Sequence, residues 1–118
     1  MVLAIVDDLM FASKIKTAAG QLGLTVSFAR SSGAAIAAIR ENTPTLVILD
    51  LNNPRTDPLG TVAAIKGDPV TMGIRIVGYA SHVQTDVIDA ARQAGVDEVM
   101  ARSAFTARLP DILAAAGR

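Results

Sequence analysis

The sequence predicts an α/β protein with one parallel five-stranded sheet and helices on both of its faces. Short, continuous apolar runs, as expected of strands buried on both faces, alternate five times with longer segments that carry apolar residues near helical spacing. Such alternation is typical of parallel strands joined by helical crossovers. The chain has 118 residues, of which 51% are hydrophobic, and no linker or repeat divides it. We therefore expect a single domain, residues 1–118, with a core of its own.

The first strand and helix are predicted on either side of two acids. The run VLAIV, residues 2–6, has the continuous hydrophobicity of a buried strand, and Asp7 and Asp8 follow it directly. In residues 9–23 apolar side chains recur near helical spacing, and Gly23 suits the end of a helix.

The second unit has a clear start and end for its helix. The run LTVSFA, residues 24–29, predicts a strand. Residues 31–42 predict a helix with Ser31 or Ser32 as its N-cap, because a serine hydroxyl accepts a hydrogen bond from an otherwise unpaired backbone N–H. Pro44 ends this connection.

The third unit begins with a strand that leads straight into a carboxylate. The run TLVILD, residues 45–50, predicts this strand, which ends at Asp50. The stretch LNNPRTDPLG, residues 51–60, is rich in turn-forming residues and predicts a loop. A short helix is expected over residues 61–68, and Gly67 marks its end.

The rest of the chain predicts two more units. In order, they are a strand at 73–80, a helix at 83–95, a strand at 96–101 and a helix at 106–117. The last strand is shorter and more polar than the others, so we place it at an edge of the sheet. We expect Thr106 to cap the last helix and Pro110 to lie in its first turn, where no backbone donor is required.

Composition and charge exclude several classes of function. Eleven basic and eleven acidic residues give a formal net charge of zero, and no basic run stands out, so nucleic-acid binding is not expected. Cysteine is absent, which removes disulfides and thiolate metal sites and fits a reducing compartment. The apolar start of the chain is too short for a membrane span and lacks the basic region of a signal peptide. We therefore expect a soluble cytoplasmic protein without membrane partners.

Three carboxylates are predicted to meet at one edge of the sheet. Working groups gather at the carboxyl ends of parallel strands, and Asp7, Asp8 and Asp50 stand at two such ends. If these strands are neighbours, the like charges raise each other's pKa, and a hard cation relieves the repulsion. Mg²⁺ prefers oxygen ligands, and the backbone carbonyl of Asn52 adds another. A carboxylate beside such a cation can attack a phosphoryl group and form an aspartyl phosphate.

A purely structural role for these acids is the alternative. Asp7 and Asp8 would then cap the first helix, and Asp50 would cap a turn. Because all three follow apolar strands, we favour the functional interpretation. His82 is the only histidine and follows the same edge, but we interpret it as a solvated loop residue.

Three segments together resemble the receiver domain of bacterial two-component response regulators. They are AIVDD at 4–8, VILDLNNP at 47–54 and ARQAGVDEVMAR at 91–102. The resemblance covers essentially the whole chain, with these segments in the same order and at matching spacings. It implies a doubly wound, flavodoxin-like (βα)5 fold with the strand order 2-1-3-4-5.

The resemblance also implies a role for each residue at this edge. Asp50 would be the phosphoacceptor, and Asp7, Asp8, Asp50 and the Asn52 carbonyl would hold Mg²⁺. A histidine kinase, a phosphotransfer protein or a small phosphodonor would supply the phosphoryl group, and a downstream protein would receive the signal. The only chemistry implied is autophosphorylation and autodephosphorylation of Asp50. The face of the fourth helix, fifth strand and fifth helix is implied as a candidate homodimer surface.

The residues that would respond to the phosphoryl group depart from the family's pattern. The family places Ser or Thr at the end of the fourth strand, whereas this chain has Ala80 there and Ser81 one residue later, on the opposite face of an extended strand. Arg102 takes the place of the family's lysine, and its planar fork binds differently. Val99 stands at the position of an aromatic switch residue. Tyr79 is the nearest aromatic and is expected to face the other way.

These departures leave three functions open. The first is a signalling domain that accepts phosphate on Asp50 and has a weakened switch. The second is a phosphate-independent pseudo-receiver that acts as a protein interaction module. The third, a phosphatase with an aspartate nucleophile, is least favoured, because Asn52 stands where its DxDxT motif needs a second acid.

Overall fold

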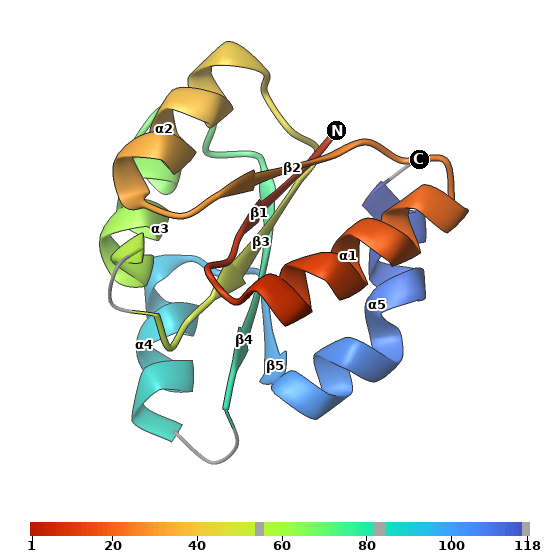
Figure 1. Ribbon diagram of the computed structural model, residues 1–118. Coiled ribbons are helices and arrows are strands. Elements are labelled where there is room, and N and C mark those ends of the chain that lie inside the picture. Colours follow the sequence, from red (N-terminus) through yellow and green to blue (C-terminus); the bar gives the residue numbers. More distant parts are fainter. Residues whose placement is uncertain (54–55, 82–84, 117–118) are drawn as a thin grey trace.

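Five parallel strands form one sheet at the centre of the computed structural model, which describes residues 1–53, 56–81 and 85–116. The strands are β1 (Val2–Ile5), β2 (Val26–Ala29), β3 (Leu46–Asp50), β4 (Arg75–Ala80) and β5 (Glu98–Ala101). The helices are α1 (Leu9–Gln21), α2 (Ser32–Glu41), α3 (Pro58–Lys66), α4 (Thr85–Ala94) and α5 (Arg102–Ala116). Helices and strands alternate along the chain (Figure 1), and the sheet has the order β2-β1-β3-β4-β5. The predicted fold class and strand order are confirmed, and β5 lies at an edge as expected.

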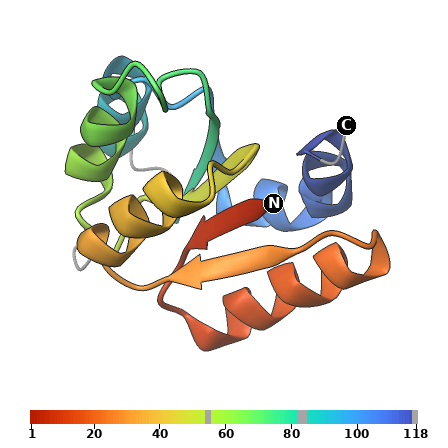
Figure 2. The ribbon, with the colours of Figure 1, turned by 90° about the horizontal axis from the view of Figure 1, so that it is seen from above.

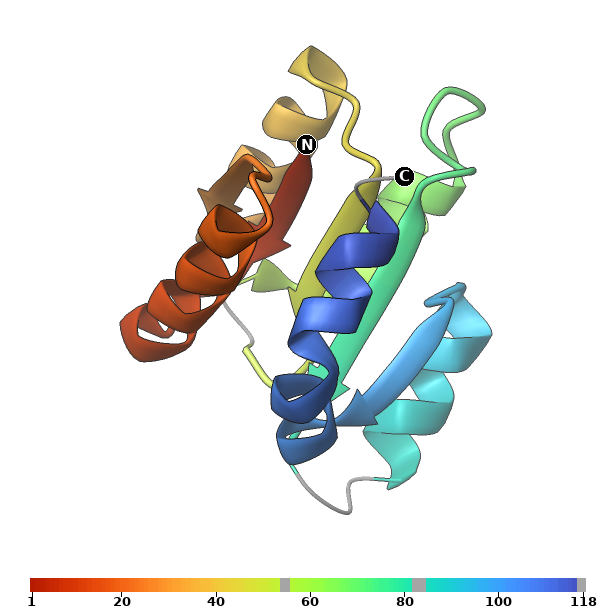
Figure 3. The ribbon, with the colours of Figure 1, turned by 90° about the vertical axis from the view of Figure 1, so that its right-hand side faces the viewer.

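The helices form one layer on each face of the sheet. α1 and α5 cover one face, and α2, α3 and α4 cover the other (Figure 2). Figure 3 views the molecule from the first of these faces, with α5 in front of the sheet. Each face has its own apolar core. The core beneath α1 and α5 contains three aromatic rings, those of Phe11, Tyr79 and Phe105.

The strand register decides which side chains share a face of the sheet. Asp50 in β3 pairs with Tyr79 in β4. Register partners in parallel strands project to the same face, so both side chains point toward the α1–α5 layer. Ala80, the next residue in β4, belongs to the opposite core, beneath α2, α3 and α4. The prediction that Tyr79 and residue 80 face opposite ways is confirmed.

Two of the predicted helix signals act as expected. Ser31 is the N-cap of α2, and its hydroxyl accepts a hydrogen bond of 3.1 Å from the backbone N–H of Ala34. Gly23, just after α1, has a φ of 70°. Glycine adopts this left-handed conformation without strain, because it has no Cβ atom. These two residues fix the start of α2 and the turn that leads into β2.

The start of α5 was predicted wrongly. α5 begins at Arg102, directly after β5, so Thr106 does not cap it and Pro110 lies in its interior. The Thr106 hydroxyl instead donates a hydrogen bond of 3.0 Å to the carbonyl of Arg102. The buried residues of α5 are Phe105, Leu109, Ile112 and Leu113. This apolar face continues past the proline, so we infer that packing against the sheet outweighs the backbone hydrogen bond that Pro110 cannot donate.

The start of α3 was also predicted too late. The helix begins at Pro58 rather than at residue 61, and the preceding Asp57 has a φ of 43°. Proline suits the first helical position, because its missing N–H has no helical partner there. Gly67 follows the last helical residue, as predicted. The strands β2, β4 and β5 each begin two residues later than their apolar runs suggested.

Ion pairs at the β5 edge of the sheet give a small, testable contribution to stability. Glu98 accepts hydrogen bonds from Arg108 Nη1 at 2.8 Å and from Arg75 Nη2 at 2.9 Å. The bond from Arg108 is the main reason that the pKa of the Glu98 carboxyl lies below its usual range. All three side chains are partly exposed. Solvent therefore screens the pairs, and we expect each to contribute only ~0.2–1 kcal/mol.

The variant Glu98→Gln is expected to lower the free energy of unfolding slightly at neutral pH. A carboxyl whose pKa is depressed in the folded state stabilises the protein above its unfolded pKa, and that contribution is lost as pH falls through the folded pKa. Urea denaturation of both proteins from neutral to strongly acidic pH measures the difference, which should shrink toward zero in acid. A difference that grows as pH falls would contradict this assignment.

Candidate phosphoacceptor and metal site

Asp50 lies at the carboxyl end of β3, the middle strand of the sheet, and its side chain is half-buried. Its Oδ1 accepts a hydrogen bond of 2.9 Å from the backbone N–H of Asn52. Burial raises the pKa of the Asp50 carboxyl above its usual range, and the negative charges of Asp8 and Asp7 add to the rise. The Asn52 hydrogen bond and the positive charge of Arg102 oppose it. The structure therefore brings Asp50 within electrostatic reach of both other acids.

Asp8 caps the first helix, which is the structural role considered above as the alternative. It also pairs with an arginine, Arg102. It is the N-cap of α1, and its Oδ1 accepts hydrogen bonds from the backbone N–H groups of Met10 (2.9 Å) and Phe11 (3.2 Å). Its Oδ2 accepts a hydrogen bond of 2.6 Å from Arg102 Nη2. The bond from Arg102 is the main reason that the pKa of Asp8 lies below its usual range.

Asp7 lies at the same edge and faces a different arginine. Its Oδ1 is 3.8 Å from Arg30 Nε, an ion pair in which the arginine is well exposed. β1 is hydrogen-bonded to β3, with Ile5 opposite Leu49, so the segments after these two residues emerge side by side. The predicted adjacency of the two acid-bearing strand ends is thus confirmed.

The oxygen donors at this edge match the chemistry of a divalent cation, although the present geometry is not a finished metal site. Within the described ranges, no group of three or more His, Cys, Asp or Glu residues is arranged to hold a metal ion. The oxygen donors gathered at this edge are the Asp7, Asp8 and Asp50 carboxylates and the Asn52 carbonyl, all hard oxygens. Mg²⁺ often uses only one or two carboxylates and fills the remaining positions with water and phosphate oxygens. The donor set fits Mg²⁺ in kind, and the metal site stays a prediction.

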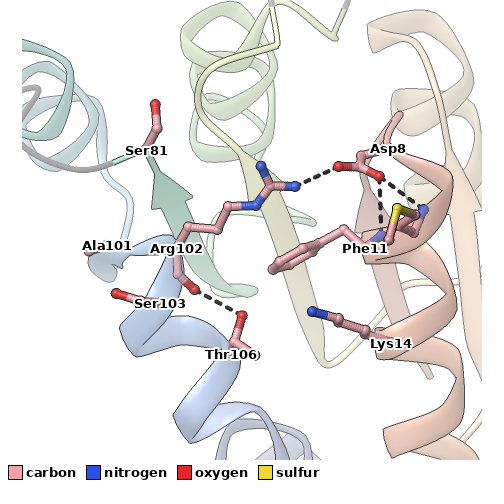
Figure 4. Close-up of a pocket in the computed structure, with 9 residues that line it drawn as sticks. Asp8, Phe11, Lys14, Ser81, Ala101, Arg102, Ser103 and Thr106 are labelled. Atoms are coloured by element: carbon pink, nitrogen blue, oxygen red, sulfur yellow. Dashed lines mark hydrogen bonds and ion pairs between the residues drawn. The ribbon is translucent and has the colours of Figure 1, made fainter.

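Arg102 bridges the two helices that flank this edge. It is the first residue of α5, and Figure 4 shows its guanidinium reaching across to Asp8 at the start of α1. The guanidinium carbon also lies 4.6 Å from the centroid of the Phe11 ring and 5.9 Å from that of Tyr79. Cation–π contacts of this kind contribute ~0.5–1 kcal/mol at exposed sites. Arg102 is thus held by a carboxylate on one side and an aromatic ring on another.

The end of β4 has no hydroxyl that faces Asp50. Ala80 is fully buried in the opposite core. The Ser81 hydroxyl donates a hydrogen bond of 3.0 Å to Asn52 Oδ1, and the Ser81 backbone N–H donates to the same oxygen. Ser81 is therefore tied to the loop after Asp50, and in Figure 4 its hydroxyl does not point toward Arg102.

A pocket of about 470 Å³ opens beside the Arg102–Asp8 pair, between α1 and α5 (Figure 4). Its walls combine apolar side chains with cations and hydroxyls. The lining residues are Asp8, Met10, Phe11, Lys14, Ser81, Ala101, Arg102, Ser103 and Thr106. Met10 is 78% exposed and Leu9, next to it, is 68% exposed. The pocket therefore reaches the edge of the sheet from the α1–α5 side.

Tyr79 lies on the same face of the sheet as Asp50, its partner in the strand register. Its ring is buried, with its centroid 4.6 Å from that of Phe11 and 4.8 Å from that of Phe105. Burial raises the pKa of its hydroxyl, and the Asp50 charge adds to the effect. The sequence alone does not give the register of β3 and β4. That register is what places Tyr79 on the same face as Asp50. Val99, at the expected aromatic position, is buried in the opposite core.

The Tyr79 hydroxyl gives a stability prediction. It is buried and has no hydrogen-bond partner among the residues that the structure describes. Leaving a buried polar group unpaired costs ~1–3 kcal/mol. Tyr79→Phe should therefore raise the free energy of unfolding by up to about 2 kcal/mol, whereas Tyr79→Leu, which also removes the ring, should lower it. Urea denaturation followed by circular dichroism measures both, and a clear loss of stability in Tyr79→Phe would show that the hydroxyl has a partner.

One predicted feature of this edge lies outside the described residues. His82 falls in the undescribed segment 82–84, so its interpretation as a solvated loop residue is not tested.

The doubly wound sheet, with Asp50 at the tip of its middle strand, agrees with the receiver-domain pattern that the sequence resembles. The model of the response regulator receiver domain family matches residues 2–114. The chain belongs to this family, whose members act in two-component signalling. Receiver domains are generally non-enzymatic and interact with histidine kinases or phosphotransfer proteins and with downstream effectors.

Solved structures agree with this assignment. The phosphorylated cyanobacterial phytochrome response regulator RcpA is 26% identical, with a TM-score of 0.80 over 95% of this chain and 86% of that one. A response regulator from Hahella chejuensis is 19% identical, with a TM-score of 0.86 over 96% and 91%. The Mn²⁺-bound form of response regulator Rcp1 is 24% identical, with a TM-score of 0.74 over 94% and 89%. A comparison with curated protein sequences finds no match.

These findings do not favour the alternative of a phosphate-independent module. None of the helices in the described part of the chain is long and apolar enough to cross a membrane.

Proposed function

We propose that Asp50 accepts a phosphoryl group in the presence of Mg²⁺ and that the protein signals through contacts with other proteins. The observation that carries this proposal is the position of Asp50, at the tip of the middle strand and within electrostatic reach of Asp7, Asp8 and Arg102. Phosphorylated RcpA and Mn²⁺-bound Rcp1, which have the same fold, support it. The absence of cysteine supports a cytoplasmic location.

The proposed reaction is a transfer between an incoming donor and one carboxylate oxygen. An oxygen of Asp50 attacks the phosphorus, and the bond from phosphorus to the donor breaks. That bond is P–N in a phosphohistidine and P–O in acetyl phosphate, and the leaving atom keeps the electron pair. Asp50 Oδ2 is the better placed nucleophile, because Oδ1 already accepts the Asn52 N–H. The donor would be a histidine kinase, a phosphotransfer protein or a small phosphodonor.

The surrounding residues prepare this carboxylate for the reaction. Mg²⁺, held by Asp7, Asp8, Asp50 and the Asn52 carbonyl, would neutralise negative charge on the incoming phosphoryl group. Burial destabilises the ionised form of Asp50 and so favours its use as a nucleophile once a cation is near. Asn52, fixed by its bonds from Ser81, keeps the loop after β3 in place.

The response to phosphorylation is expected to be weaker than in a receiver with a serine or threonine at residue 80. Ala80 offers no donor to the phosphoryl oxygens, and the Ser81 hydroxyl is committed to Asn52. Loss of one donor to a developing negative charge costs ~3–4 kcal/mol in comparable sites. Arg102, whose positive charge reaches Asp50, would then carry most of the response.

Two surfaces are proposed for protein contacts. The α1–α5 pocket opens at the reacting edge, so a phosphodonor protein would approach there. A homodimer through the α4–β5–α5 face remains a proposal, and that face carries the Glu98–Arg108 ion pair. The downstream partner would bind whichever surface changes on phosphorylation.

Nuclear magnetic resonance with a phosphoryl mimic tests this function. Beryllofluoride and Mg²⁺ together should shift the amide signals of Asp50, Ala80 and Arg102, whereas Mg²⁺ alone or fluoride alone should not reproduce the full change. The shifts should follow a single saturable curve. No response at millimolar concentrations of both components would contradict the proposal and favour a phosphate-independent interaction module.

A further inference from the structure

A groove between α3 and α4 lies on the face of the sheet away from the α1–α5 pocket. The two helices pack side by side there (Figure 1, Figure 2), and the groove between them has a volume of about 310 Å³. Apolar side chains and two carboxylates line it, and the described lining contains no cation. This groove is separate from both surfaces proposed above for protein contacts.

The apolar part of the groove is fixed at its base and open to solvent at its sides. Its buried end is formed by Leu51, which directly follows Asp50 and is 7% exposed. The Leu51 backbone N–H donates a hydrogen bond of 2.9 Å to the carbonyl of Tyr79, which holds this residue against β4. Leu59 in α3 is 44% exposed, and Val87 in α4 is only partly buried. Covering these side chains in a complex would remove apolar surface from water.

The two carboxylates stand on opposite sides of the groove. Asp57 precedes α3 and makes no side-chain capping bond, and its carboxylate lies over Gly60, where no larger side chain would fit. Asp86 lies in the first turn of α4 and is exposed. Neither carboxylate forms an ion pair with any of the residues that the structure describes. An apolar groove is thus flanked by two negative charges, one from each helix.

We propose that the α3–α4 groove docks a basic amphipathic segment of a protein partner. Apolar side chains at helical spacing on that segment would fill the groove against Leu51 and Leu59. Lysine or arginine beside them would pair with Asp57 and Asp86, whereas an acidic segment would bring like charges together. Charge complementarity therefore selects a basic partner. The inference goes beyond the proposed function and does not depend on phosphorylation of Asp50.

The probe for this groove is a helical peptide of leucine, lysine and alanine, with leucines at i and i+4 and lysines beside them. The full chain is titrated with this peptide, without Mg²⁺ or a phosphodonor, and followed by amide shifts in nuclear magnetic resonance. The amides of Leu51, Leu59 and Val87 should shift along one saturable curve. A peptide with glutamate in place of lysine should bind at least about fivefold more weakly.

Two variants of the groove have matched controls elsewhere on the surface. Leu59→Ala and Asp86→Asn should each weaken binding about two- to fivefold. Leu22→Ala, just after α1, makes the first change at a leucine that is also 44% exposed. Asp111→Asn makes the second change at an exposed acid of α5. Both controls should bind the peptide like wild type, and thermal unfolding verifies that each variant is folded.

Three results would overturn the inference. The first is the absence of a saturable shift at the groove amides. The second is equal binding of the acidic peptide, or equal weakening by the control variants, which would show that the peptide does not read the groove. The third is a shift of these amides with protein concentration alone, together with the sedimentation mass of a dimer, which would assign the groove to a second copy of the chain. None of these results bears on phosphorylation of Asp50, which the beryllofluoride titration tests separately.

Discussion

Asp50→Asn should reduce phosphate incorporation from acetyl phosphate and Mg²⁺ to the level of a sample without protein. An amide has no anionic oxygen with which to attack phosphorus, and the described structure places no other carboxylate at the tip of β3. The measurement is intact-protein mass spectrometry over a time course. Asp111→Asn, which changes an exposed acid on α5, is the matched control and should be phosphorylated like wild type.

Loss of folding would not explain a negative result in this variant. Burial and the neighbouring acids raise the pKa of Asp50, which means that the ionised carboxylate is disfavoured in the folded protein. Such a group destabilises the fold at pH values above its folded pKa and ceases to do so in acid. Asp50→Asn should therefore be at least as stable as wild type at neutral pH. Continued phosphorylation of a folded Asp50→Asn protein would refute the assignment of the phosphoacceptor.

Phe105→Ala should lower the free energy of unfolding by about 3–5 kcal/mol. The Phe105 side chain is fully buried between α5 and the sheet, with its ring centroid 4.8 Å from that of Tyr79 and 5.7 Å from that of Phe11. Its removal leaves a cavity and breaks two ring contacts. A loss of this size is a large part of the ~5–15 kcal/mol typical of a domain, so the variant should unfold at a much lower urea concentration.

Phe28→Ala is the matched control for this prediction. It makes the same chemical change in the edge strand β2, where the Phe28 side chain is 38% exposed. The loss should be clearly smaller, because less surface is removed from the core and water already reaches the site. If the two variants lose equal stability, the aromatic cluster is not the centre of the α1–α5 core.

The fold was predictable because local and global signals agree along most of the chain. The apolar runs of the central strands, such as VLAI and LVIL, are buried throughout, and Ser31 and Gly23 mark helix ends as their chemistry requires. The start of α5 was not predictable in this way. Pro110 and Thr106 are common at helix starts, but the apolar face of α5 is buried on both sides of them. Tertiary packing there overrode two local preferences.

The sequence predicted that the acids of the candidate site lie at one edge of the sheet. It did not predict most of the contacts that these residues make. The rule that parallel strands end at one edge placed Asp50 beside Asp7 and Asp8. It did not show that Asp8 caps α1 while binding Arg102, because that ion pair joins residues 94 positions apart in the chain. The location of Tyr79 beside Asp50 likewise depends on the register of β3 and β4, which the apolar pattern leaves open. These contacts are where the response of this receiver is expected to differ from the family's pattern.

The most direct test is to identify the phosphorylated residue chemically. The protein is treated with acetyl phosphate and Mg²⁺, the acyl phosphate is reduced with borohydride to a homoserine, and peptides are sequenced by mass spectrometry. We expect homoserine at residue 50 and at no other aspartate. Homoserine at residue 7 or 8, or none at any position while Mg²⁺ binding is saturated, would contradict the account.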